Sequence, residues 1–321
     1  MTDDEYRELQ QHLSHDPEAG DVMPGTAAVA RNRLHLARPM TGRHRSGVCA
    51  PRGRRVASPA AVTLGAARQE QIHTIWDELA GFEAAESEAA LIHVLGAVAE
   101  LIDAQNAYWL GVVRMSEDER DPLLGWRPRA IRYLRPLAAD ETYARQKIRS
   151  MGRGDFDEST AAHVRLVGAY RACRLRDLVS PAWFEGETYT IGYVGRGIHD
   201  ALVVGAPVNL MAEGYYGFHR KRPGDPFTAT QRDLALYAMR GLTWFHRHVL
   251  LGHGLLVARA PLSPMERRVL ALLLTDRSEK RIAADLDVSP ATVHTYVRDV
   301  MRKFGVSGRS GLTALWLGRQ P

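Results

Sequence analysis

The chain has 321 residues, which suggests two domains at about 150 residues each, and 45% of its residues are hydrophobic, enough for a sizeable core. No apolar run approaches the ~18 residues that span a bilayer, the acidic N-terminus has no signal-peptide pattern, and two cysteines are too few for a disulfide framework or a zinc site. We therefore expect a cytoplasmic protein without membrane contact or bound metal.

The net charge of +5 is distributed unevenly. Residues 1–21 carry seven acids and one arginine, and residues 22–69 carry nine arginines and no acid. Residues 262–321 carry ten lysines and arginines against six acids. A basic arm and a basic C-terminal segment favour a polyanionic partner, of which nucleic acid is the obvious one.

The first 68 residues are predicted to be a disordered basic tail. Residues 22–63 are rich in Arg, Ala, Pro and Gly without a helical or strand period, so they cannot bury enough apolar area to offset the entropy of ordering. The alternative is an arm that binds DNA through its arginines, which are Arg31, Arg33, Arg38, Arg43, Arg45, Arg52, Arg54 and Arg55.

Residues 69–255 are predicted to form an α+β sensor domain. Apolar residues at helical spacing predict helices over 69–81, 87–102, 157–175 and 229–251. Runs of β-branched and aromatic residues predict strands over 107–115, 130–134, 201–208 and 213–219. Helices before, between and after pairs of strands are typical of one antiparallel sheet flanked by helices.

The end of this region resembles a GAF-type sensor domain. Residues 215–220 (YYGFHR), then 224–228 (GDPFT) and the long helix, are similar to the last strand, turn and closing helix of that family. The resemblance covers roughly residues 70–255 and implies that the domain receives a signal or a partner, or that it serves only for dimerisation.

Aromatic residues and one histidine near the expected sheet are candidates for a ligand pocket. They are Trp109, Tyr133, Tyr189, Tyr193, His199 and Tyr215. The alternative for each is ordinary packing.

Residues 256–261 are expected to be a linker, and residues 262–321 to form four short helices. Ser263 and Glu266 make a capping box with Pro264 at the first helical position. Ser278, Ser289 and Ser307 are expected to cap the next three helices, and Gly305 to end the third.

The third helix, which begins at Pro290, is predicted to be the recognition helix of a helix-turn-helix unit. Val293, Val297, Val300 and Phe304 lie on one face of a 3.6-residue period. The outer face is polar, and short helices joined by tight turns place such a helix in the major groove of DNA. Helix N-termini and capping hydroxyls such as that of Ser289 also suit phosphate groups.

This segment resembles the LuxR-type helix-turn-helix domain along almost its whole length, without gaps. The matching positions are Leu262, Ser263, Pro264, Glu266, Val269, Leu270, Ser278, Lys280, Ile282, Ala283, Leu286, Val288, Ser289, Thr292, Val293, Val300, Lys303, Gly305, Val306, Arg309 and Leu312.

The resemblance implies roles for individual residues. The implied base contacts come from His294, Thr295 and Arg298. The implied phosphate contacts come from Lys280, Thr292, Arg302 and Lys303. The implied dimerisation residues are Val306, Leu312, Leu315 and Trp316.

The chain departs from the family pattern at several positions. Asp276 stands where a Gly is usual, Glu279 and Arg281 replace a common Asn and Glu, and His294 and Tyr296 replace a usual Lys and His. A neutral imidazole at a base-contacting position weakens the electrostatic attraction to DNA and makes affinity depend on pH.

We therefore expect a homodimeric transcriptional regulator that binds double-stranded DNA, with RNA polymerase and a small-molecule ligand as further candidate partners. An acyl-homoserine-lactone receptor is the alternative, because Trp109, Asp121-Pro122 and Trp126 partly match that family, although Val113 replaces its Tyr. No Walker A motif, receiver pocket or framed catalytic group is present, so we expect neither an enzyme nor a bound cofactor.

Overall fold

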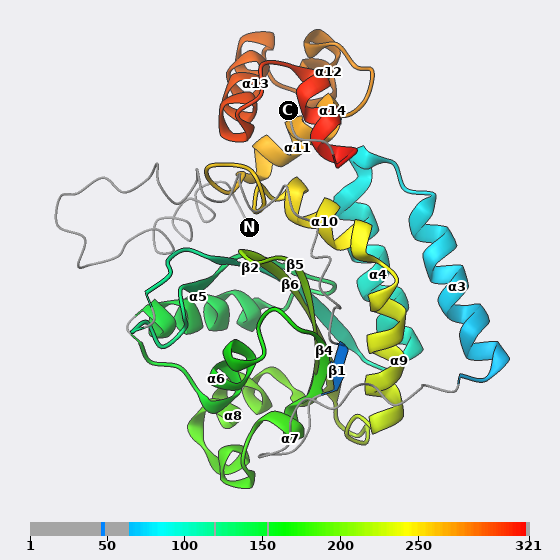
Figure 1. The fold of residues 1–321 in the computed structure, drawn as a ribbon, viewed down its shortest axis with the longest axis vertical. Coiled ribbons are helices and arrows are strands. Elements are labelled where there is room, and N and C mark those ends of the chain that lie inside the picture. The colour runs from blue at the N-terminus through cyan, green and yellow to red at the C-terminus, as the bar shows by residue number, and fades with distance from the viewer. Residues whose placement is uncertain (1–45, 49–63, 119, 153, 319–321) are drawn as a thin grey trace.

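The computed structural model describes residues 46–48, 64–118, 120–152 and 154–318. It contains a sheet enclosed by helices and, at the C-terminal end, a group of four short helices (Figure 1). No helix among the described residues is long and apolar enough to cross a membrane.

A six-stranded sheet forms the centre of the larger part. Its spatial order is β1 (Ser46–Val48), β4 (Tyr170–Arg174), β5 (Ile198–Asn209), β6 (Ala212–Lys221), β2 (Asn106–Arg114) and β3 (Trp126–Tyr133). Neighbouring strands pair antiparallel except β1 and β4, which are parallel. The predicted antiparallel sheet with flanking helices is confirmed.

The prediction that residues 1–68 lack regular structure is wrong in two places. Residues 46–48 form β1 at the edge of the sheet, and the first helix of the next segment begins at Ala66. The arginines of the expected arm lie outside the described residues.

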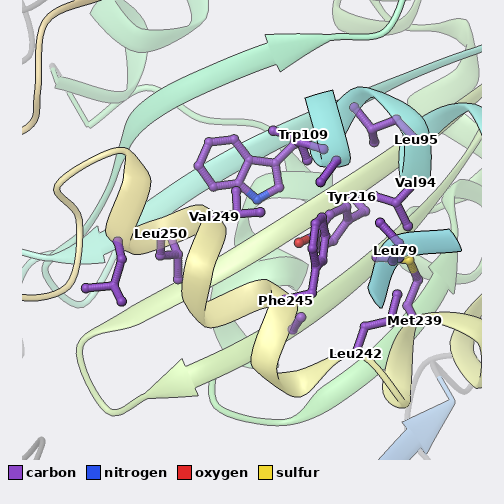
Figure 2. Packing of buried hydrophobic residues seen from close by; sticks show 14 of the residues in the cluster. Leu79, Val94, Leu95, Trp109, Tyr216, Met239, Leu242, Phe245, Val249 and Leu250 are labelled. Atoms are coloured by element: carbon purple, nitrogen blue, oxygen red, sulfur yellow. The ribbon is translucent and has the colours of Figure 1, made fainter. Parts of the chain in front are cut away.

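One face of the sheet is covered by helices from both ends of the sensor region. They are α3 (Ala66–Ala80), α4 (Ser87–Leu101), which follows the short turn η1 (Ala84–Glu86), α9 (Ala229–Arg240) and α10 (Thr243–Gly252). Figure 2 shows Trp109 of β2 and Tyr216 of β6 packed with Phe245, Val249 and Leu250 of α10. This layer is the main hydrophobic core.

The opposite face is covered by the chain between β3 and β5. It contains α5 (Ala138–Gly152), α6 (Glu158–Arg165), α7 (Leu175–Leu178), η2 (Pro181–Glu185), α8 (Glu187–Gly192) and η3 (Val194–Arg196). In Figure 1 these elements lie on the other side of the strands from α3, α4 and α9.

Two predicted helices differ from the structure, and one observed helix was not predicted. The helix expected over 157–175 ends at Arg165, and its last third is strand β4, because pairing with β5 outweighs local helical preference. Helix α5 was not predicted. The long helix expected over 229–251 is interrupted at Gly241, where a Cβ would lie 2.6 Å from the ring of Trp76.

The C-terminal helices are α11 (Pro264–Leu273), α12 (Glu279–Leu286), α13 (Pro290–Phe304) and α14 (Arg309–Trp316). The capping box of Ser263 and Glu266 is present, Ser278 and Ser289 accept from the backbone amides of Arg281 and Thr292, and Gly305 ends α13 at φ 67°. The cap of α14 is Gly308 and not Ser307 as predicted.

The predicted linker packs against both parts of the molecule. Leu255, Leu256 and Leu262 are buried. The amide of Leu262 donates to the carbonyl of His253 (3.1 Å), and the amide of Arg259 donates to the carbonyl of Lys303 (2.9 Å). Buried side chains of α11 to α14 therefore continue the core formed with the sheet.

A buried ion pair joins two strands on the face of the sheet that α5 and α6 cover. The side chains of Arg171 in β4 and Glu213 in β6 are 2% and 0% exposed, with Nη1 and Oε1 2.5 Å apart. Arg171 also donates to Tyr215 Oη (2.7 Å), and Glu213 accepts from the amide of Gly168 (3.0 Å). Gly205 is required opposite, because a Cβ there would lie 2.6 Å from the guanidinium carbon.

We expect Arg171→Leu or Glu213→Leu to lower the free energy of unfolding by about 3–5 kcal/mol, because each leaves one buried charge without its partner. Urea unfolding at pH 7.5 measures this loss. The double variant Arg171→Leu/Glu213→Leu removes both charges and should lose less than either single variant. A double loss equal to the sum of the two single losses would contradict this account.

Candidate functional site

The polar face of α12 and α13 carries the residues expected to contact DNA. We call it the recognition face and define it by exposed side chains, which are Lys280, Ser289, Thr292, His294, Thr295, Arg298 and Arg302. The opposite side of α13 is fixed in the core by Val293, Val297 and Val300. Helices α12 and α13 lie at the end of the molecule remote from the sheet (Figure 1), so the recognition face is open to a duplex.

Two side chains of the recognition face are paired with acids. Nδ1 of His294 lies 3.1 Å from Oε2 of Glu279, at the start of α12. Arg302 Nη2 lies 2.7 Å from Oδ1 of Asp299, one turn earlier on α13. No ion pair of Arg298 or Lys280 is recorded among the described residues, so these two cations are the best placed to neutralise phosphate or meet a base edge.

Lys303 is placed differently from the sequence-based expectation. Its ammonium donates to Glu266 Oε2 (2.7 Å) and to the carbonyl of Pro261 (3.0 Å). This cation therefore ties the end of α13 to the linker and the start of α11. It is occupied inside the chain and does not belong to the recognition face.

The expected dimerisation residues are also placed inside the chain. Leu312, Leu315 and Trp316 are 0%, 2% and 6% exposed. Val306 is half-buried against Gly311. Helix α10 reaches the end of α14, where Arg247 donates to the carbonyl of Leu315 (2.9 Å). In this arrangement these side chains pack within one chain, and their role in a dimer interface stays a prediction.

A cavity of about 210 Å³ lies between the sheet and the helices α5 and α6. Most of its lining is apolar, and three of the predicted ligand residues contribute to it, namely Tyr133, Tyr193 and Tyr215. Tyr108 and Tyr143 add two further phenol rings.

Trp109 does not line this cavity, contrary to expectation. It is fully buried on the helical face of β2, where its ring lies 4.5 Å from that of His253 (Figure 2 shows the tryptophan). Successive residues of a strand point to opposite faces, so Tyr108 and Leu110 reach the cavity instead. Tyr189 and His199 are also outside the lining, and Tyr189 Oη donates to the carbonyl of His199 (2.9 Å).

The ionisable side chains of the cavity are neutral or paired. Burial lowers the pKa of His163 and of His219 to about 3 each, and burial raises the pKa of Tyr143 to about 12. Arg196 is paired with Asp140, and its guanidinium carbon lies 4.6 Å from the ring centroid of Tyr143. The cavity therefore suits an uncharged, largely apolar molecule with a few polar atoms.

Sequence reasoning missed Tyr143 and His163 because they lie on α5 and α6, of which α5 was not predicted and α6 was misjudged in length. It missed Tyr108 and His219 because both were placed on strands without deciding which face of the sheet their side chains occupy. The alternation along β2 and β6 would have placed them. Among the described residues no group of three or more His, Cys, Asp or Glu could hold a metal ion.

We expect acid to destabilise the sheet domain. His163 and His219 stay neutral in the folded chain, whereas unfolded histidine takes up a proton near pH 6.5. Stability is therefore complete above about pH 6.5 and falls, as the pH drops toward 4, by up to about 1.4 kcal/mol per pH unit for each histidine. Urea unfolding from pH 8 to 4.5 measures this slope, which His219→Phe should reduce. His73→Gln, which replaces an exposed histidine, is the control. A stability slope in His219→Phe as steep as that of the wild-type protein would contradict the assignment.

Comparison with known proteins identifies the C-terminal segment. Residues 260–316 match the family model of bacterial regulatory proteins of the luxR family. The chain is 35% identical over 75 residues to the transcriptional regulatory protein MctR of Rhizobium johnstonii, covering 22% of this chain and 35% of MctR. It is 43% identical over 49 residues to the spore germination protein GerE of Bacillus subtilis, covering 15% of this chain and 66% of GerE. The chain therefore spans about a third of one relative and just under two thirds of the other.

Two solved structures show a weaker likeness. SdiA in complex with octanoyl-rac-glycerol has a TM-score of 0.36 and 13% identity, covering 80% of this chain and 97% of that chain. The VqsR LBD domain of Pseudomonas aeruginosa has a TM-score of 0.40 and 12% identity, covering 58% and 98%. These values do not assign a fold family to the sheet domain. The family match, together with the capped helices and the exposed polar face of α13, shows that the C-terminal domain is a LuxR-type helix-turn-helix domain.

Proposed function

We propose that the protein is a sequence-specific, DNA-binding transcriptional regulator that acts in the cytoplasm as a homodimer. The observation that carries this proposal is the LuxR-type helix-turn-helix domain with its recognition face exposed at the end of the molecule. In a dimer, two such faces would contact half-sites about 34 Å apart, one turn of the duplex. RNA polymerase is the further partner that a regulator of this kind would contact.

The sheet domain is proposed to be a GAF-like sensor whose signal enters the cavity beside β2 and β3. Support comes from the layout of helices around one antiparallel sheet and from the cavity lining, which is apolar with phenol groups and neutral histidines. A ligand that fits this lining is small and largely apolar and carries hydrogen-bond acceptors for the tyrosine hydroxyls.

An acyl-homoserine-lactone receptor is the second candidate. Of the residues that suggested it, only Trp126 lines the cavity. Trp109 lies in the core on the other face, and Asp121 accepts from the amides of Leu123 and Gly125 in the turn before β3. The arrangement therefore favours a sensor with a different set of ligand contacts.

Selection from a pool of random duplexes with the full chain, at two salt concentrations, tests DNA binding directly. Enrichment of a short inverted repeat, with affinity that falls as salt rises, supports a dimeric regulator. A folded protein that enriches no sequence contradicts the proposal, provided that the isolated residues 259–321 also enrich none.

Arg298→Ala should weaken binding to the selected sequence by about 1–3 kcal/mol if Arg298 meets a guanine, and should relax selection at that base pair. Fluorescence anisotropy with the selected duplex measures the loss. Arg68→Ala, which removes an exposed arginine from α3, is the matched control and should bind as the wild-type protein does. Equal affinity of both variants would remove Arg298 from the interface.

The contact between His294 and Glu279 makes a second prediction for the same face. His294→Lys places a permanent positive charge at this position and should tighten binding to the selected duplex, because a cation there attracts phosphate. Glu279→Gln should also tighten binding, because it removes an anion 3.1 Å from the imidazole. Fluorescence anisotropy with the selected duplex measures both changes. Unchanged affinity in both variants would place this pair outside the interface.

A further inference from the structure

One carboxylate holds three cationic or ionisable side chains at the boundary between the sheet domain and the DNA-binding domain. Glu88, in the first turn of α4, has Oε1 3.1 Å from Nε of Arg267, 3.2 Å from Nε2 of His253 and 3.3 Å from Nε of Arg132. Burial by itself would raise the pKa of Glu88, but His253, Arg132 and Arg267 together hold it well below its usual range. These partners therefore favour the carboxylate form of Glu88.

The three partners come from different parts of the molecule. Arg132 is on β3 opposite Trp109, so its guanidinium lies on the helical face of the sheet, where it lines a second cavity of about 380 Å³ together with Glu88 and Arg267. Its neighbours Ile131 and Tyr133 line the ligand cavity. Its Nη1 donates to the carbonyl of Ile131 (2.6 Å), whereas its Nη2 is buried without a hydrogen-bond partner among the described residues. Strand β3 therefore carries cavity-lining residues on one face and the contact with Glu88 on the other.

Arg267 belongs to the DNA-binding domain. It is on α11, and besides Glu88 it donates to the carbonyl of Leu262 (3.2 Å). The amide of the same Leu262 donates to the carbonyl of His253, whose ring is the third partner of Glu88. Leu262 and Glu88 thus connect the end of α10, the linker and the start of α11.

We propose that the contacts Arg132–Glu88–Arg267 couple the ligand cavity to the docking of the DNA-binding domain. This inference rests on the proposed function, since it names how the sensor signal reaches α11. A ligand that displaces Ile131 or Tyr133, the neighbours of Arg132 that line the cavity, shifts β3 and draws the guanidinium away from Glu88. The carboxylate then changes its contact with Arg267 and, through Leu262, the closure of the linker.

The partial exposure of Glu88 suits this role. Its side chain is 43% exposed, against 11% for Arg267 and 16% for Arg132. Ion pairs in contact with water have small free energies, so they can be exchanged without unfolding either domain.

Hydrogen exchange of the full-length protein tests the coupling without a ligand. The amide of Leu262 exchanges only when the linker opens, so its protection reports the docked population. We expect Glu88→Ala to lower this protection about three- to tenfold. Arg132→Ala should lower it too, through the contact that Arg132 shares with Arg267 at Glu88. The amide of Gln105, bonded to His219 inside the sheet domain, should be unchanged.

The decisive variant is Glu88→Ala/Arg132→Ala. If Arg132 acts through Glu88, the double variant has the protection of Glu88→Ala alone. Arg127→Ala is the matched control, because it removes another arginine of β3, whose partner Asp121 lies within the sheet domain (2.9 Å). The proposal is overturned if Arg132→Ala leaves Leu262 protected, or if its effect adds fully to that of Glu88→Ala. Neither outcome depends on DNA, so loss of the proposed regulatory function would be seen separately, in the duplex selection.

Discussion

Alternation along β2 places its neighbouring aromatic residues in two different environments. Trp109 points into the helical layer and lies against His253, whereas Tyr108 points into the cavity. The same alternation separates Tyr216 from Tyr215 on β6. Because side chains of one strand pair fill both the core and the cavity wall, the cavity has a rigid floor that also supports α10. The position of α10 in turn fixes where the C-terminal domain can sit.

The hydrophobic core of the C-terminal domain is continuous with that of the sheet domain, and the segment between the two is packed against both. Leu255, Leu256 and Leu262 are buried along the connection, and α10 reaches the backbone of α14 through Arg247 and His248. This arrangement explains why Leu315 and Trp316 are unavailable to a second copy of the chain. A dimer of this protein in the docked arrangement has to use other surfaces.

The C-terminal domain could be predicted almost to the residue, because its signals are local. Capping hydroxyls, Pro290 and Gly305 define helix ends within a few residues of sequence. The sheet domain was harder, because residues 170–174 have apolar spacing that also fits a helix, and only their pairing with β5 makes them a strand. Three of the six candidate ligand residues, Trp109, Tyr189 and His199, lie outside the cavity lining for the same reason. Trp109 and His199 were chosen as candidates for their side-chain chemistry. Which side chains line the cavity depends instead on the face of the strand or turn that carries them, and tertiary contacts determine that face.

The Arg171–Glu213 pair and the contacts of Glu88 differ in how easily they can be exchanged. Arg171 and Glu213 are buried almost completely, so separating them would leave an unpaired charge in the interior. The contact between them is therefore permanent in the folded chain. Glu88 is close to water and has three partners, so one contact can be exchanged for another at small cost. A signal that arrives in the cavity can therefore change the contacts of Glu88 while the Arg171–Glu213 pair keeps β4 and β6 in place. Because this pair holds β4 and β6 in place, a small movement of α11 relative to the sheet changes the position of the recognition face in a defined way.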